Sequence, residues 1–442
     1  MTKIQNYIFS ASRWLVLFSV LGLILRRGLF KPYTLQPFEI IIILASILFL
    51  FIVFKKKLFS HIGPVWIWFL GVIALLLLLG FVNSFFIFGI DSSILAPSSK
   101  DFFLLTTVFL GFYLTAIYGE DPTFRKRIFY FLSGAILFTP FIFFPQHAFT
   151  AGVMTDGFQF IGWQNNPTIF GLFVLIPFII CVEQTFRQKR WLAKTPYWIG
   201  AILLYSLILW SSSRGIWFAS ILAVGFLSFY YIFKIYLPHS LLRNISTVAV
   251  LLFFSFLSSF LILSSPVKIM VLDRVFPIIS NYTARPEIFK ELSLNESFII
   301  MRSKEKNLPE VPYQNRKLIF SQALGLLVKH PYGIGPEYFR IIPHSIFDGE
   351  KGPTTAHNTF LQAGLSGGFL LIIVYVLLWI KIWQTLMRTQ RDQEWLWLSA
   401  SLLGIFFVSM LGDFLFYVPA IWILMGLVVA KGKTPPMDKI AS

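Results

Sequence analysis

The sequence predicts an all-α polytopic membrane protein, and two observations carry that prediction. Of its 442 residues, 57% are hydrophobic and 18% are aromatic, and the mean hydropathy is +0.75. These values lie far outside the range of a soluble domain. Apolar runs of about 20 residues also recur along the chain, and a run of that length crosses a bilayer as one helix.

The apolar runs predict about twelve transmembrane helices, with about nine before the longest polar segment and about three after it. We place these helices near residues 8–25, 36–54, 64–87, 101–118, 128–145, 166–184, 196–212, 214–234, 245–264, 357–382, 395–411 and 413–430. The chain then divides into an N-terminal transmembrane bundle (1–264), one large polar loop between helices 9 and 10 (265–356), and a C-terminal transmembrane region with a short tail (357–442).

Basic residues predict the orientation of these helices. The net charge of +17 comes largely from lysines and arginines in loops that an even number of spans places on one side of the membrane. The positive-inside rule makes that side cytoplasmic, so both termini lie inside and the loop 265–356 lies outside. Only the loop with Arg26, Arg27 and Lys31 disagrees. Because topology accounts for the charge, it does not suggest nucleic acid as a partner.

The outer loop 265–356 contains a predicted amphipathic helix near residues 315–330. Asn315 is a candidate cap, and His330-Pro331 with Gly333 ends the pattern. We expect this helix to lie against the membrane surface or the outer ends of the spans, as a lid. Its apolar face consists of Leu318, Ile319, Ala323, Leu326 and Leu327.

Three basic residues are predicted near helix N-termini on the outer side: Arg214, Arg316 and His357. A cation is unfavourable at the positive end of a helix, but a bound anion reverses the penalty, because amide groups and guanidinium can share its oxygens. For His357 the helix end favours the neutral imidazole, which is the form of a general base.

Simpler roles stay open for each of these residues. A lone arginine at the end of a span is commonly an interface anchor, and a histidine beside threonines is commonly a polar residue at a helix start. Ser212 or Ser213 can cap the helix that begins near Arg214. Asn358, or the threonines before it, can cap the helix that follows His357.

Four segments carry a resemblance to a known family. They are GWQNNPTIFGLF (162–173), SSSRGIW (211–217), an arginine about a dozen residues before HPYGIGPEYF (330–339), and AHNTFLQAGLSGG (356–368). In this order and topology they resemble the O-antigen ligase family, to which the O-antigen polymerases are related.

The resemblance implies a GT-C-like glycosyltransferase of the bacterial inner membrane that uses neither metal nor cofactor. Such a ligase takes a glycan from undecaprenyl diphosphate on the periplasmic side and transfers it to a sugar hydroxyl of lipid A–core. By the same resemblance Arg214 and Arg316 bind the diphosphate, and His357 is the essential histidine. One direct displacement, with His357 as general base, inverts the anomeric configuration.

Further residues have weaker claims on the site. Neither the six histidines nor the single cysteine, Cys181, shows metal-ligand spacing, so no metal site is predicted. Arg302, Arg285 and Arg274 compete with Arg316 because they lie in the same loop, and His344 is a second candidate base. The possible supporting residues are Asn166, Arg302, Arg285, His344 and Asp413.

Two other functions stay open at this stage. An O-antigen or exopolysaccharide polymerase uses the same donor with a glycan acceptor, and a related variant transfers to protein. A transporter for an anionic lipid-linked glycan belongs to a different class, but transporters usually have internal repeats and ionisable residues near the bilayer midplane. The single large outer loop favours the ligase over the polymerase, and the charges at span ends favour an enzyme over a transporter.

Overall fold

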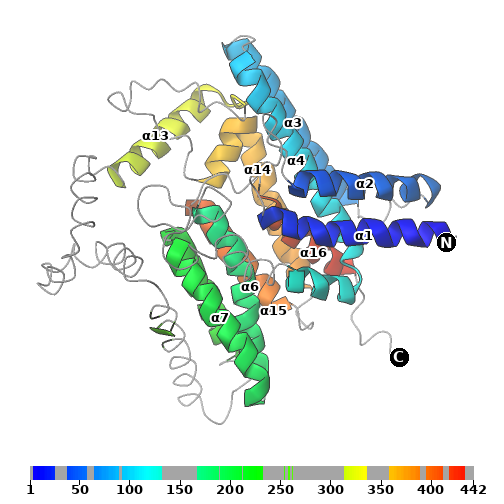
Figure 1. Ribbon diagram of the computed structural model, residues 1–442. Coiled ribbons are helices and arrows are strands. Elements are labelled where there is room, and N and C mark those ends of the chain that lie inside the picture. Colours follow the sequence, from blue (N-terminus) through cyan, green and yellow to red (C-terminus); the bar gives the residue numbers. More distant parts are fainter. Residues whose placement is uncertain are drawn as a thin grey trace, which may run out of the picture. The chain divides into compact units, whose positions relative to one another are not determined.

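A computed structural model describes residues 3–24, 37–56, 64–88, 92–131, 167–188, 190–211, 213–231, 253, 257–258, 261, 313–335, 358–388, 395–411 and 418–433. Every regular element in this part of the chain is a helix (Figure 1), so the all-α prediction is confirmed there. The chain forms two compact units. The first contains Met1–Leu132 and Leu318–Ser442, and the second contains Ser133–Lys317.

The first unit opens with four helices: α1 (Lys3–Ile24), α2 (Pro37–Lys56), α3 (Pro64–Phe88) and α4 (Ser92–Tyr118). Helices α1 and α2 lie side by side (Figure 1), and the Ser12 hydroxyl donates to the carbonyl of Ala45 over 2.8 Å. Helix α4 begins at Ser92, well before the predicted start near residue 101. Hydropathy located only its apolar part, because the first turns are rich in serine.

The same unit ends with most of α13 (Tyr313–Lys329), which crosses the boundary between the units at Leu318, and with three further helices: α14 (Thr359–Met387), α15 (Trp395–Leu411) and α16 (Pro419–Lys433). Glycine allows α16 to pack closely on α4, because a Cβ on Gly426 would lie 2.7 Å from the Phe112 carbonyl oxygen. Trp422 packs its ring on Phe109 and Phe112 at this contact. The core of the unit therefore joins helices from both ends of the chain.

The second unit contains α6 (Pro167–Arg187), α7 (Trp191–Ser211) and α8 (Arg214–Tyr230). Helix α6 packs against both of the others. The short turns on either side of α7 fall where the sequence predicts them, between 184 and 196 and between 212 and 214. The predicted span 245–264 lies almost entirely outside the described residues.

Four helical segments in the described residues are long and apolar enough to cross a membrane: Pro64–Ile87, Phe170–Arg187, Trp191–Ser211 and Thr359–Met387. Five further apolar helices are shorter. Large apolar side chains cover the outside of α3, where Trp68 and Phe86 are 71% and 84% exposed. Such a surface is stable only against lipid or another protein. The chain is thus a helical membrane protein, while its number of spans stays a prediction.

Helix α14 is not the single continuous span that the sequence predicts over 357–382. Its backbone breaks at Gly367 and Gly368, and Gly368 has φ +85°. A residue with a side chain is strained in that left-handed region, whereas glycine is not. The break separates a short first segment, Thr359–Ser366, from the long apolar segment that follows. All eight residues of the first segment are buried.

The turn that follows α13 fits into this break. The Phe369 amide donates to the Pro331 carbonyl over 3.0 Å, and the Ile334 amide donates to the Leu365 carbonyl over 2.7 Å. These two bonds satisfy backbone groups that the interrupted helix leaves unpaired. Gly333 adopts φ +84°, and a Cβ there would lie 2.6 Å from the Gly368 nitrogen. We call residues 331–335 and 365–369 together the glycine seam.

Helix α3 closes the glycine seam from a third side. The Asn83 side-chain amide donates to the Gly333 carbonyl over 2.6 Å. A Cβ on Gly80 would lie only 1.9 Å from the Ser366 carbonyl oxygen, and a Cβ on Gly335 would lie 3.1 Å from Cβ of Ser84. Backbone therefore packs on backbone here, and only glycine allows that approach.

We predict that Gly80→Ala lowers the melting temperature of the purified protein, because the new Cβ collides with the Ser366 carbonyl. Gly71→Ala is the matched control, since both glycines lie in α3 and nothing lies within 4 Å of a Cβ at Gly71. Alanine in a helix interior is favoured over glycine by about 1 kcal/mol. The control should therefore be as stable as wild type or more so. Equal melting temperatures for the two variants would contradict the close packing at Gly80.

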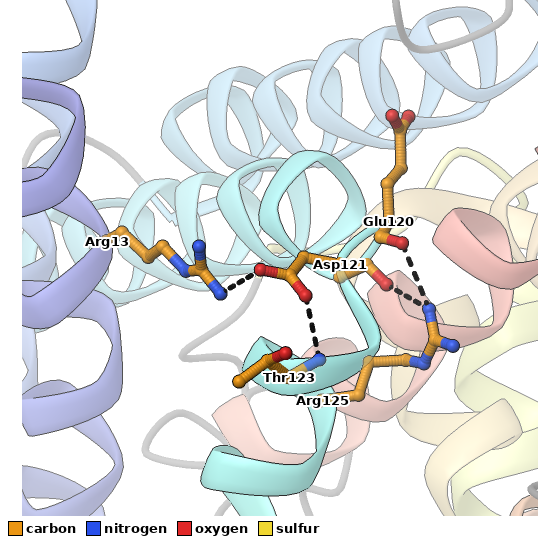
Figure 2. A network of polar contacts seen from close by, with 6 residues as sticks. Arg13, Glu120, Asp121, Thr123 and Arg125 are labelled. Carbon is orange, nitrogen blue, oxygen red and sulfur yellow. Dashed lines mark hydrogen bonds and ion pairs between the residues drawn. The ribbon is translucent and has the colours of Figure 1, made fainter. Parts of the chain in front are cut away.

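A polar network joins α1 to the turn after α4 (Figure 2). The Arg13 guanidinium forms an ion pair with the Asp121 carboxylate, which also accepts the Thr123 amide over 2.7 Å. Arg125 is only 4% exposed and donates to the carbonyls of Gly119, over 2.6 Å, and Glu120, over 3.3 Å. These carbonyls follow directly on the last residue of α4, Tyr118, and a cation at this negative end of a helix is favourable.

This network predicts a loss of stability in acid. Partial burial alone would raise the pKa of the Asp121 carboxyl, but the Thr123 amide and Arg13 together lower it below its ordinary value. A lowered pKa contributes stability above the unfolded-state value, and that stability disappears as the pH falls through the folded value. Because the carboxylate is 39% exposed, we expect less than about 1 kcal/mol. Melting curves at several pH values should show a steeper acid decline for wild type than for Asp121→Asn.

Candidate functional site

The structure describes one of the three principal predicted site residues with its side chain. Arg214 is the first residue of α8, as predicted, and it is exposed. Arg316 lies in the first turn of α13, but its side chain is outside the described set. The remaining predicted residues lie outside the described residues: His357, Asn166, Arg285, Arg302, His344 and Asp413.

In the second unit, the starts of α6 and α8 lie together. The hydroxyls of Thr168 and Ser213 are 3.0 Å apart and share a hydrogen bond. A Cβ on Gly171 would lie 2.8 Å from Cγ1 of Ile216, so glycine lets the two helices approach closely. The motifs GWQNNPTIFGLF and SSSRGIW, about 45 residues apart in sequence, thus meet at one place.

Ser213 is the N-cap of α8, which is one of the two predicted candidates. Its backbone carbonyl accepts the amides of Ile216 and Trp217, each over 3.1 Å. Its side chain makes no cap bond, because it pairs with Thr168 instead. Helix α8 is held further where the Trp217 indole donates to the Ile208 carbonyl over 3.0 Å. Arg214 therefore begins a helix whose start is held by these bonds, and the first turn of that helix contains no acidic residue.

In the first unit, Asn358 is the N-cap of α14, as predicted. Its side-chain oxygen accepts the Leu361 amide over 2.9 Å. Its side-chain amide donates to the Met410 carbonyl of α15 over 3.0 Å. One side chain thus caps one helix and binds the last turn of another. His357 is the residue immediately before this cap.

Helix α13 differs from the prediction at its start and agrees at its end. It begins at Tyr313, so Asn315 lies within the first turn and is not the N-cap. It ends at Lys329, where the His330 amide still bonds to Leu326 and the Gly333 amide bonds to the His330 carbonyl. The sequence pattern located the apolar face of this helix correctly. It did not locate the start, because Tyr313 and Gln314 are equally compatible with a loop and with a first helical turn.

One face of α13 packs on the first segment of α14. Ala323 and Leu327 are buried with Ile334, Leu361 and Leu365. The predicted apolar face is therefore confirmed for Ala323 and Leu327, and Leu326 packs partly against the same cluster. Ile87 at the end of α3 adjoins it as well. Helix α13, the start of α14 and the end of α3 thus form one packed group.

The described residues contain no group of three histidine, cysteine, aspartate or glutamate side chains that could hold a metal ion. Within the second unit, the motifs at 162–173 and 211–217 meet at Thr168 and Ser213. Within the first unit, the described parts of the motifs at 330–339 and 356–368 meet at the glycine seam. A shared cavity for Arg214 and His357 stays a prediction.

Sequence reasoning missed Asn83, which holds the glycine seam from α3. A signal existed, because asparagine is rare and expensive within an otherwise apolar span. Gly367 and Gly368 end the motif AHNTFLQAGLSGG. Paired glycines also signal a possible interruption of a helix.

A comparison with known families agrees with the motifs. The family model described as O-Antigen ligase matches residues 199–376, which include SSSRGIW, HPYGIGPEYF and AHNTFLQAGLSGG. The motif at 162–173 lies before this stretch. No curated protein matches the chain. The predicted resemblance is confirmed over residues 199–376, which match the model of the O-antigen ligase family, a family of glycosyltransferase-like membrane enzymes.

Proposed function

We propose that this protein is an inverting, metal-independent glycosyltransferase of the O-antigen ligase type. It moves an O-antigen-type glycan from undecaprenyl diphosphate to a sugar hydroxyl of lipid A–core, at the periplasmic face of the bacterial inner membrane. The observation that carries the proposal is the meeting of the starts of α6 and α8, with Arg214 exposed in the first turn of α8. Two helix N-termini with a guanidinium suit a diphosphate.

The proposed reaction is one displacement at the anomeric carbon. The acceptor hydroxyl oxygen attacks that carbon, and the bond from the carbon to the diphosphate oxygen breaks. His357 accepts the hydroxyl proton, and undecaprenyl diphosphate leaves with its charge held by Arg214 and Arg316. Preorganised charge-assisted bonds to a departing oxyanion stabilise the transition state more than the ground state. No further energy source is needed, because the donor is already activated.

The packing of the first unit supports the proposed topology. Ile87 at the end of α3, Asn358 at the start of α14 and Met410 at the end of α15 are all predicted on the periplasmic side. Ile87 packs beside Leu361, and Asn358 bonds to Met410. Arg13 and Asp121, both predicted near the cytoplasmic side, form an ion pair. Helix ends that are predicted on the same side of the membrane thus lie together within this unit.

Reconstitution tests the function directly. The purified protein in liposomes should convert undecaprenyl-diphosphate-linked glycan and lipid A–core to the ligated product, with chelator present and no nucleotide added. Parallel reactions should contain donor alone, to detect polymerisation, and a peptide acceptor. Product that forms only in the reaction with both donor and lipid A–core supports the ligase.

The other outcomes assign the alternatives. Lengthened glycan on the lipid diphosphate in the donor-only reaction would make the protein a polymerase. Movement of intact donor across the liposome membrane without any new glycosidic bond would make it a transporter. Activity that disappears with chelator and returns with a divalent ion would contradict the metal-independent mechanism.

A further inference from the structure

The first segment of α14, Thr359–Ser366, is held at both of its ends. At its start, Asn358 caps the segment through Leu361 and bonds to the Met410 carbonyl of α15. At its end, the glycine seam bonds the segment to the turn after α13. The segment therefore has a side-chain anchor at its start and backbone anchors at its end.

The anchors come from three different helices. The Met410 carbonyl belongs to α15, the Ile334 amide follows α13, and Asn83 of α3 holds the seam through Gly333. The side of the segment is filled by Leu361 and Leu365 against Ala323 and Leu327 of α13. The segment thus has a fixed position relative to the three helices that surround it.

The interruption of α14 explains why these anchors matter. Gly367 and Gly368 break the helix, so the long segment after Phe369 does not set the direction of the short one. The orientation of the chain at Asn358 instead depends on the bonds at the two ends of the segment. Side-chain hydrogen bonds have a preferred distance and angle, and a shift of about 1 Å in a catalytic group can cost about 100-fold in rate.

We propose that Asn358 and Asn83 are positioning residues, which hold segment Thr359–Ser366 as a platform that orients His357. Asn358 acts directly, because it is the next residue in the chain and its side chain joins α14 to α15. Asn83 acts from the other end, through Gly333 and the glycine seam. The inference rests on the proposed function, in which His357 removes the acceptor proton.

Asn358→Ala removes both bonds of the platform at its start. We expect the turnover number for transfer to fall about 10- to 100-fold, while the affinity for the lipid-linked donor stays within about twofold of wild type. Donor binding should persist because the diphosphate residues are elsewhere. Ser409→Ala is the matched control, since it removes a 2.9 Å intrahelical bond one residue from Met410 and should leave transfer unchanged.

Asn358→Ser separates positioning from simple stability. Serine is a good N-cap, so it should restore the melting temperature that alanine lowers. Its side chain has no amide and is too short to reach the Met410 carbonyl, so the turnover number should stay low. If Asn358→Ser restored both properties, Asn358 would be a cap alone and the positioning role would be wrong.

Asn83→Ala provides an independent test from the far end of the platform. Its turnover number should fall with donor affinity retained, whereas Ser84→Ala, which removes a local 2.5 Å bond to Phe81, should behave as wild type. Wild-type turnover in both Asn358→Ala and Asn83→Ala would overturn the proposal while leaving the ligase function intact. Wild-type protein that forms no product would instead contradict the proposed function itself.

Discussion

Replacing His357 with alanine should abolish glycan transfer while the protein still inserts and still binds the lipid-linked donor. A general base contributes about 10²- to 10⁴-fold to the rate of such a reaction. His357 is the residue immediately before the N-cap of α14. We expect the turnover number to fall by that factor, with little change in donor affinity.

His330→Ala is a suitable control for this experiment. His330 lies in the predicted loop 265–356, which ends just before His357. Its backbone contributes to the turn after α13, but its side chain has no assigned role. Transfer should therefore continue at close to the wild-type rate. Two outcomes would count against the general base: normal turnover in His357→Ala, or loss of donor binding in that variant with the fold preserved.

Replacing Arg214 with alanine should give a loss of comparable size, but of a different kind. In the proposed mechanism the guanidinium contacts the diphosphate in both the ground state and the transition state, so donor affinity and turnover should both fall. Loss of one preorganised donor to a developing oxyanion costs about 10²- to 10³-fold in turnover. Arg214→Lys should recover only part of this, because an ammonium group cannot form the paired, planar contact of a guanidinium.

Arg190→Ala is the matched control for Arg214. Arg190 is also exposed and also lies in the second unit, in the turn between α6 and α7 at the opposite end of α6 from Thr168. Its loss removes the same charge from the same unit. Donor titration and turnover of the two variants should therefore differ sharply. If Arg214→Ala bound donor as well as Arg190→Ala does, the diphosphate role would have to be abandoned, and Arg316→Ala would become the next variant to test.

The helices were largely predictable because burial in lipid demands long apolar runs. The starts and ends of α3 and α15 agree with hydropathy within a residue or so, since charged or polar residues flank both. Hydropathy failed where a helix is polar, at the start of α4, and where an apolar run is not one helix, at Gly368. Hydropathy measures only how apolar a run of residues is. It therefore detects neither a polar helix start nor a backbone break within an apolar run.

The candidate site was predictable as residue types and only partly as geometry. Basic residues at helix starts indicate an anion site, and α8 and α13 both begin next to their arginines. The bond from Thr168 to Ser213 could not be foreseen, because it joins different helices through side chains common throughout the chain. The sequence predicted the capping role of Asn358, because a cap involves residues that are close in sequence. It could not predict the bond to the Met410 carbonyl, which lies 52 residues away.

The bond between Asn83 and Gly333 has a consequence for the biogenesis of the protein. Its partners are 250 residues apart, so α3 enters the bilayer long before the carbonyl that its amide will meet has been made. At roughly 5–20 residues per second, synthesis of that interval takes on the order of 12–50 s. During this interval, the Asn83 side-chain amide in the apolar helix α3 needs another hydrogen-bond partner. Ribosome-bound chains stalled before residue 333 should therefore hold α3 less firmly than longer ones.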